Sequence, residues 1–307
     1  MAFALDGHWV WDFWVADDGE TFHLYYLRAP TSLGDPDLRH RNARIGHATS
    51  PDLTDWTDHG EVLGPGAAGA FDETATWTGC VVRGDDGLWR MFYTGASFVD
   101  GSSPRNVEAI GMATSVDLHT WDKRDGFVLR AAGEYYERLG DTSWPDEAWR
   151  DPWVFRDPAG DGWHMLITAR GAGGSTTGGG VVGHAWSPDL DTWTVQPPLT
   201  DPAPAFPHLE VLQLAELDGA PVLLFCATRS DGADGVWAVP AAAVPTGIRI
   251  DDARLILPAP AYAGRIVTDR AGIPVLLAFT RDETGAPVGL TDPVAADPLW
   301  RASRSLG

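Results

Sequence analysis

Short apolar runs separated by Gly, Asp and Pro recur along the whole chain. Five of these runs follow a glycine and are rich in aromatic or β-branched residues; the glycines are Gly19, Gly87, Gly162, Gly219 and Gly272. Apolar runs of this composition, bounded by turn residues, predict β-strands. Another strand-like run and an Asp or Gly turn precede each glycine, so each pair of runs predicts a hairpin.

A second pattern, Ser-x-Asp-Leu-x-x-Trp, follows the first three hairpins. It occurs at Ser50–Trp56, Ser115–Trp121 and Ser187–Trp193. We expect its Asp to accept hydrogen bonds from local backbone amides in a turn, while its Leu and Trp pack beneath. We therefore interpret the pattern as structural. The last two hairpins lack it, which predicts that their units are shorter or degenerate.

Five copies of a four-stranded unit predict a five-bladed β-propeller. No segment has the long helical periodicity and the caps of an α-helix, so the fold class is expected to be all-β. Residues 1–307 are expected to form a single propeller domain without a C-terminal β-sandwich. Because the chain begins close to the first inner strand, the fifth blade is expected to take its outermost strand from residues 298–303.

The charge of the chain argues against several classes of partner. It has 22 Lys and Arg against 43 Asp and Glu, a formal net charge of −21. This excess of negative charge repels nucleic acids and anionic membranes, and it argues against a phosphorylated substrate. The first residues lack the features of a secretory signal, and no apolar run could span a bilayer, so we expect a cytoplasmic location.

Cysteine and histidine give no sign of a cofactor. Cys80 and Cys226 lie on predicted strands of different blades, which favours buried thiols over a disulfide. No spacing of Cys or His resembles a metal site, so neither a metal nor another cofactor is expected. The 15 Trp are expected to pack mostly between blades, with a few against a sugar ring.

Three acidic residues occur in short motifs, each shortly before a predicted strand of the same type. They are Asp12 in Trp-Asp-Phe-Trp, Asp151 in Arg-Asp-Pro and Glu210 in His-Leu-Glu-Val. In a closed ring of blades their carboxyl groups would converge on the axis. Each one alone would suit a turn or the surface, but together they match the carboxyl pair that cleaves glycosidic bonds.

Four motifs resemble, in order and over nearly the whole chain, those of glycoside hydrolase families 32 and 68. These are the β-fructofuranosidase and fructosyltransferase clan, which is related to family 43. The motifs are Trp11-Asp12-Phe13-Trp14, Trp77-Thr78-Gly79-Cys80, Arg150-Asp151-Pro152 and Glu210-Val211. The surroundings of Asp12 are closer to family 68, and Glu-Val is closer to family 32.

The resemblance implies a role for each carboxyl group. Asp12 would be an ionised nucleophile, Glu210 the general acid and base, and Asp151 a holder of sugar hydroxyls. A retaining mechanism implies about 5–5.5 Å between the carboxyls of Asp12 and Glu210, and we expect the neighbouring carboxylates to raise the pKa of Glu210. The expected substrate-binding residues are Trp11, Trp77, Thr78, Arg150, His208 and Arg265.

The expected activity is the retaining hydrolysis of terminal β-fructofuranosyl bonds in sucrose or short fructo-oligosaccharides, with water or another sugar as acceptor. The partner is then a small carbohydrate, and a homodimer could cover the flank that a missing sandwich leaves bare. Two alternatives stay open. One is an inverting arabinofuranosidase or xylosidase like those of family 43, with carboxyls about 6.5–9.5 Å apart. The other is a non-catalytic propeller that binds carbohydrate.

Overall fold

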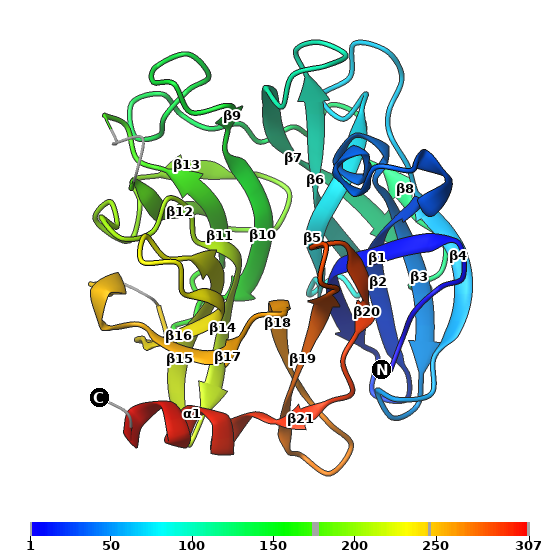
Figure 1. The fold of residues 1–307 in the computed structure, drawn as a ribbon, viewed down its shortest axis with the longest axis vertical. Coiled ribbons are helices and arrows are strands. Elements are labelled where there is room, and N and C mark those ends of the chain that lie inside the picture. The colour runs from blue at the N-terminus through cyan, green and yellow to red at the C-terminus, as the bar shows by residue number, and fades with distance from the viewer. Residues whose placement is uncertain (1, 174–177, 245–246, 306–307) are drawn as a thin grey trace.

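The computed structural model describes residues 2–173, 178–244 and 247–305 and forms five antiparallel sheets around a central axis (Figure 1). The first sheet contains β1 (His8–Asp17), β2 (Phe22–Pro30), β3 (Arg44–Ser50) and β4 (Thr57–Leu63). The second contains β5 (Ala75–Arg83), β6 (Trp89–Phe98), β7 (Asn106–Ser115) and β8 (Asp122–Lys123), with β9 (Asp146–Glu147) added parallel to β7.

The remaining three sheets follow in chain order. The third contains β10 (Trp149–Arg156), β11 (Trp163–Arg170), β12 (Gly180–Ser187) and β13 (Thr194–Gln196), and the fourth contains β14 (Glu210–Leu217), β15 (Ala220–Thr228), β16 (Asp234–Pro240) and β17 (Arg254–Pro258). The fifth contains β18 (Ala261–Thr268), β19 (Pro274–Arg281), β20 (Pro287–Leu290) and β21 (Val294–Ala295). Short helices are η1 (Thr31–Leu33), η2 (Pro36–Asn42), η3 (Ile250–Asp252) and α1 (Ala296–Ser305).

The first strands of the five sheets close the ring. Each contacts the next around the axis, in the order β1, β5, β10, β14 and β18, and β18 contacts β1 again. The predicted five-bladed propeller is thereby confirmed. All five glycines that begin the second strands have positive φ; at Gly162, with φ 116°, an added Cβ would lie 2.4 Å from the carbonyl oxygen of Ser187.

The repeated Ser-x-Asp-Leu-x-x-Trp pattern forms a structural turn, as predicted. In the first copy Asp52 Oδ1 accepts hydrogen bonds from the amides of Thr54 and Asp55 at 2.9 and 3.0 Å. The Leu of each copy is buried and adopts a left-handed φ of 63–69°. These turns also join neighbouring blades, because Tyr25 Oη of the first sheet donates to the carbonyl of Leu118 in the second at 2.6 Å.

The closure of the fifth blade differs from the prediction. Residues 298–303 belong to α1, whose Ala296, Trp300 and Ser303 are buried on one face at helical spacing. The outer edge of β19 is instead covered by β20 and β21, and the N-terminal segment lies beyond them. Phe3 forms an antiparallel bridge with Leu290, whose amide donates to the carbonyl of Phe3 at 2.8 Å.

The fourth and fifth blades also differ from each other. The fourth sheet has four strands, so the prediction that it is shorter is wrong. In the fifth sheet the third strand is interrupted, so that β20 and β21 pair separately with β19. Outside β20 lies only the bridge between Phe3 and Leu290, which fits the predicted degeneracy.

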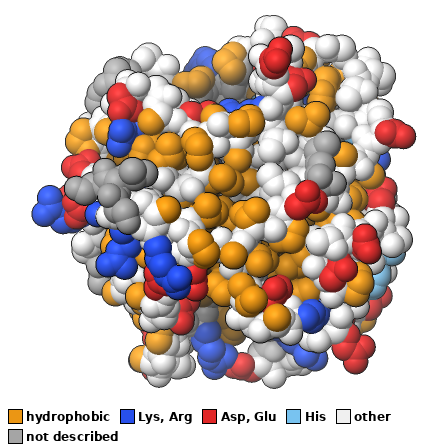
Figure 2. Space-filling view, turned by 60° about the horizontal axis from the view of Figure 1, so that its bottom comes forward, with side chains coloured by type: hydrophobic (Ala, Val, Ile, Leu, Met, Phe, Trp, Pro, Cys, Tyr) orange, Lys and Arg blue, Asp and Glu red, His pale blue; other side chains and the backbone are white. Residues whose placement is uncertain are grey.

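Hydrophobic side chains gather over the middle of the face shown in Figure 2, and Asp and Glu lie mostly toward its edge. No helix within the described part of the chain is long and apolar enough to cross a bilayer.

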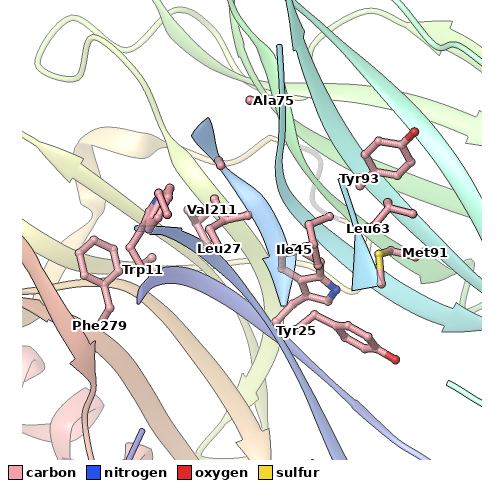
Figure 3. Packing of buried hydrophobic residues seen from close by; sticks show 14 of the residues in the cluster. Trp11, Tyr25, Leu27, Ile45, Leu63, Ala75, Met91, Tyr93, Val211 and Phe279 are labelled. Atoms are coloured by element: carbon pink, nitrogen blue, oxygen red, sulfur yellow. The ribbon is translucent and has the colours of Figure 1, made fainter. Parts of the chain in front are cut away.

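The core lies between adjacent sheets. Figure 3 shows Tyr25, Ile45 and Leu63 of the first sheet packed with Met91 and Tyr93 of the second. Cys80 and Cys226 are free, buried thiols in different sheets, as predicted. Apolar contact between sheets therefore fixes the angle at which each first strand reaches the axis.

Removing the Phe3 side chain tests the N-terminal closure of the ring. Its ring is 5% exposed and packs 4.8 Å from the ring of Tyr26. We expect Phe3→Ala to lower the free energy of unfolding by about 3 kcal/mol, as for other buried Phe side chains. Urea denaturation measures this loss. Val116→Ala, at a side chain that is 84% exposed, is the control and should change stability by less than about 0.5 kcal/mol; equal effects would contradict the closure.

Candidate active site

The same irregularity occurs in the first strand of every sheet. The pairing with the second strand shifts by one residue after Trp11, Trp77, Arg150, Glu210 and Tyr262. Such a β-bulge re-aims side chains, and bulges are common beside active sites. Asp12 and Asp151 lie inside their bulges and Glu210 immediately before its own. The acidic residues thus lie within the first strands. We had expected them shortly before these strands, and that expectation is corrected.

These bulges surround a cavity of about 690 Å³. The three carboxyl groups of Asp12, Asp151 and Glu210 line it, although the three residues are far apart in sequence. Five of the six other predicted site residues line it as well: Trp11, Trp77, Thr78, Arg150 and His208. Helix η2 contributes Arg39 and His40 to the wall.

Arg265 is the exception among the predicted residues. It is 1% exposed and is absent from the described lining of the cavity. Its Nη1 donates to the carbonyl of Leu212 at 2.6 Å, and its guanidinium lies over the ring of Trp153. The expectation that Arg265 faces the sugar site is therefore corrected. The bulge at Tyr262 turns Tyr262 toward the cavity and leaves Arg265 to satisfy backbone carbonyls that the bulges free.

Arg150 is the centre of the charged network. Its Nη1 lies 3.0 Å from Glu108 Oε1 and 3.1 Å from Asp146 Oδ2, and its Nη2 donates to Glu210 Oε1 at 2.9 Å. Its Nη2 is also 3.1 Å from His208 Nδ1. A buried guanidinium needs several partners, because each buried N–H donor without a hydrogen bond destabilises the folded state.

Glu210 is held as a carboxylate. Tyr262 Oη donates to its Oε2 at 2.6 Å, and Arg150 contacts its other oxygen. Burial acts to raise the pKa of Glu210, but His208, Arg150 and Tyr262 together lower it to about 2. We had expected a raised pKa. The correction follows because His208, the guanidinium of Arg150 and the phenol of Tyr262 together outweigh the effect of burial.

Asp12 has the opposite environment. Its one hydrogen-bond donor in the described structure is Thr78, whose Oγ1 donates to Oδ2 at 2.8 Å. Burial, followed by the charge of Asp151, raises the pKa of Asp12 to about 7, although Thr78 opposes the shift. The expectation that Asp12 is already ionised is therefore corrected: near neutral pH it is about half protonated.

Asp151 is fixed by its backbone as well as its side chain. Its φ is 55°, a left-handed conformation that costs free energy for a residue with a Cβ. Its amide donates to Thr94 Oγ1 at 2.9 Å, while its Oδ2 accepts from Thr168 Oγ1 and from the amide of Val211. Burial raises the pKa of Asp151 against the opposing effect of Arg150.

Several lining residues were not anticipated. Tyr262 occupies the same bulge position in the fifth strand as Trp11 in the first, so exact register of the repeats would have identified it. Glu108 and Asp146 come from β7 and β9 and have no motif. The connection from Leu129 to Trp149 does reach the site: Trp144 packs 4.7 Å from the ring of His208.

Comparisons with known proteins agree with this geometry. Residues 15–240 match the sequence model of the glycosyl hydrolases family 32 N-terminal domain. A sucrose-6-phosphate hydrolase from Pediococcus pentosaceus is 33% identical over 184 residues, which are 59% of this chain and 32% of the relative. The chain thus spans about a third of the length of that curated relative.

Solved structures share the fold. An inulosucrase from Halalkalicoccus jeotgali bound to kestose superposes with a TM-score of 0.73 at 23% identity, covering 92% of this chain and 79% of that chain. The full-length β-fructofuranosidase from Microbacterium saccharophilum K-1 gives 0.71 at 18% identity, covering 95% and 73%.

The raised pKa of Asp12 makes stability depend on pH. A group with a raised pKa in the folded state binds its proton more tightly there, so its contribution is lost as pH rises from about 4 to about 7. Asp12→Asn keeps the shape without the charge. We expect its advantage over the parent protein to grow by roughly 2–3 kcal/mol between pH 5 and pH 8, measured by urea unfolding.

Asp6→Asn is the matched control, because Asp6 is exposed and outside the cavity. The advantage of this variant should not change with pH. A pH-independent difference for Asp12→Asn would show that Asp12 is ionised in the folded protein throughout this range.

Proposed function

The chain belongs to glycoside hydrolase family 32, and from this premise we propose that it is a retaining hydrolase of terminal β-fructofuranosyl bonds in sucrose or short fructo-oligosaccharides. One observation carries the proposal: the carboxyls of Asp12, Asp151 and Glu210 line one cavity. Its volume of about 690 Å³ suits a small ligand.

The chemistry needs two steps. In the first, the Asp12 carboxylate attacks the anomeric carbon while Glu210 gives its proton to the departing glycosidic oxygen, leaving a fructosyl ester on Asp12. In the second, Glu210 takes a proton from water and the resulting oxygen attacks the same carbon, which frees Asp12. A sugar hydroxyl in place of water would give transfer.

Asp151 has a different role in this proposal. Its Oδ2 accepts hydrogen bonds from Thr168 Oγ1 and the amide of Val211 and lies 3.8 Å from Arg150 Nε, so the carboxyl group is held in position. It is therefore suited to accept hydrogen bonds from two sugar hydroxyls as the ring flattens toward the transition state. Trp11 and Trp77 provide aromatic walls for the sugar.

The proton of the carboxyl pair lies on Asp12 and not on Glu210. Because the pKa of Asp12 is about 7 and that of Glu210 about 2, a single shared proton prefers Asp12. The reactive arrangement needs that proton on Glu210. We infer that substrate binding moves the proton from Asp12 to Glu210. The leaving oxygen of the substrate would then replace Tyr262 or Arg150 as the hydrogen-bond partner of Glu210.

A phosphorylated disaccharide is a second candidate substrate, which the sequence had not favoured. The curated relative is named sucrose-6-phosphate hydrolase. Arg39 lines the cavity, and its Nε is buried without a hydrogen-bond partner in the described structure. Both observations are met by a phosphate at the cavity mouth.

Three further parts of the hypothesis stay predictions. Retention, and with it the separation of about 5–5.5 Å between the carboxyls, distinguishes this activity from a family-43-like inverting enzyme. NMR detection of the first-formed anomer decides between them. The cytoplasmic location and the homodimer also stay predictions.

Removal of either reacting carboxyl tests the catalytic assignment. We expect Asp12→Ala and Glu210→Gln each to lower kcat on sucrose by at least about 10²-fold, since each removes a group that reacts in the transition state. Initial rates on sucrose, sucrose 6-phosphate and short fructo-oligosaccharides measure this and rank the substrates.

Glu216→Gln is the matched control, because Glu216 lies on the same strand as Glu210 with its side chain exposed. It should retain full activity. Unchanged turnover in the two cavity variants would contradict the assignment of Asp12 and Glu210 as the reacting carboxyls.

The shared proton predicts the pH dependence. Between the two pKa values, about 2 and about 7, the pair holds one proton; above pH 7 it holds none and the leaving oxygen cannot be protonated. We expect kcat/KM to fall about tenfold per pH unit above pH 7. Thr78→Val removes a bond that lowers the pKa of Asp12, so it should move this limb to higher pH. A flat profile from pH 6 to pH 9 would contradict the assignment.

A further inference from the structure

Four histidines meet at the outer edge of the first two sheets, away from the cavity. His23 and His47 lie on β2 and β3, His59 on β4, and His119 in the turn between β7 and β8. The ligand nitrogens of His47, His59 and His119 lie within 4.8 Å of one another. No pair of these residues has the spacing of a sequence motif, so the blades themselves create the group.

A hydrogen-bond relay settles which nitrogen of His47 is free. Asp18 is an acceptor, and its Oδ1 already accepts the amides of Glu20 and Thr21 at 2.8 and 2.7 Å. Its Oδ2 lies 3.4 Å from His23 Nε2, so that nitrogen must carry the donated proton. His23 Nδ1 is then an acceptor, and His47 Nε2, at 3.1 Å, must be its donor.

His47 Nδ1 therefore has an unprotonated lone pair. His47 is fully buried, and its Nδ1 has no hydrogen-bond partner in the described structure. Its ring lies 5.0 Å from that of His59 and 4.9 Å from that of His119. A buried polar nitrogen without a partner is costly and calls for a ligand.

Neutral imidazoles suit this ligand. His59 Nε2 lies 2.8 Å from Thr49 Oγ1; when it donates this bond, its Nδ1 is also unprotonated. Carboxylate–histidine relays of this kind orient the ligands of transition metals.

We propose that His47, His59 and His119 form a binding site for a divalent transition metal of the zinc class, with Asp18 and His23 orienting His47. Three imidazoles leave a fourth tetrahedral position for water. Bond lengths of 2.0–2.1 Å imply nitrogens about 3.3 Å apart, so the group must contract on binding. His59 and His119 are exposed and can move, while His47 stays fixed.

The third sheet offers an internal comparison. There His164 Nδ1 lies 2.9 Å from His184 Nε2, and His164 Nε2 lies 2.8 Å from Asp157. This repeats the relay of Asp18, His23 and His47. The described structure has no group of three potential ligands there. The relay belongs to the repeat, and the two exposed histidines are what the first sheet adds.

Calorimetric titration of the tag-free protein with Zn²⁺ tests the proposal. We expect one ion per chain, and we expect His59→Gln and His119→Gln each to weaken binding at least about tenfold. Both leave the buried relay intact, so folding should be retained. His8→Gln is the matched control. His8 is the first residue of β1, its Nε2 is hydrogen-bonded to Arg28, and its replacement should leave Zn²⁺ binding unchanged.

Asp18→Asn tests the relay separately, since it touches no ligand. It should weaken Zn²⁺ binding about 10- to 100-fold. Binding of Co²⁺ should give the intense visible bands of a four-coordinate site, and Zn²⁺ should raise the unfolding temperature only when all three histidines are present. Equal binding by the parent protein and by the His59→Gln, His119→Gln double variant would overturn the proposal, as would no binding at all.

Discussion

The guanidinium of Arg150 is the interaction on which the rest of the site depends. It is nearly buried on β10 of the third sheet. It contacts carboxylates from β7 and β9 of the second sheet and from β14 of the fourth, so three sheets meet at one cation. Its contact with Glu210 helps His208 to lower the pKa of Glu210, whereas burial, followed by the charge of Asp151, raises the pKa of Asp12. A lysine could not make these contacts at once, because its single ammonium lacks the planar fork of Arg. Loss of one partner would leave a buried charge uncompensated.

The bulge repeated in all five first strands explains how unrelated residue types share one cavity. The position before each shift carries Trp11, Trp77, Arg150, Glu210 and Tyr262. The one-residue shift recurs at each, while the side chains differ; the next residue has a positive φ only in the third, fourth and fifth strands, at Asp151, Val211 and Ala263. A propeller can thus vary its chemistry at five equivalent points without altering the packing between sheets, which is set by the apolar faces behind them.

The fold could be predicted because its signals are local. A glycine with positive φ followed by an apolar strand needs no distant partner to be recognised. The closure of the fifth blade could not be predicted, because the choice between the segment at Phe3 and α1 depends on which packs better against the fifth sheet. Convergence of the acidic residues followed from the ring. Their pKa values could not be predicted, because Arg150 stabilises the carboxylate of Glu210 more than that of Asp12 only through their distances in the folded structure. Arg265 was misjudged for the same reason.

Charge balance favours a neutral sugar in the cavity. Among the described side chains that line it, seven are carboxylic acids and four are arginines. Burial keeps a proton on Asp12 near pH 7, and the charge of Asp151, which belongs to this excess, adds to the effect. A neutral disaccharide leaves the balance unchanged, so the proton needs only to move from Asp12 to Glu210. A phosphate adds about −1.5 to −2 charges. Such a substrate would raise the pKa of Asp12 further and oppose the lowering of the pKa of Glu210, unless Arg39 in the cavity wall compensates the added charge. The ratio of activities on sucrose and its 6-phosphate therefore measures how strongly Arg39 is coupled to the inner carboxyls.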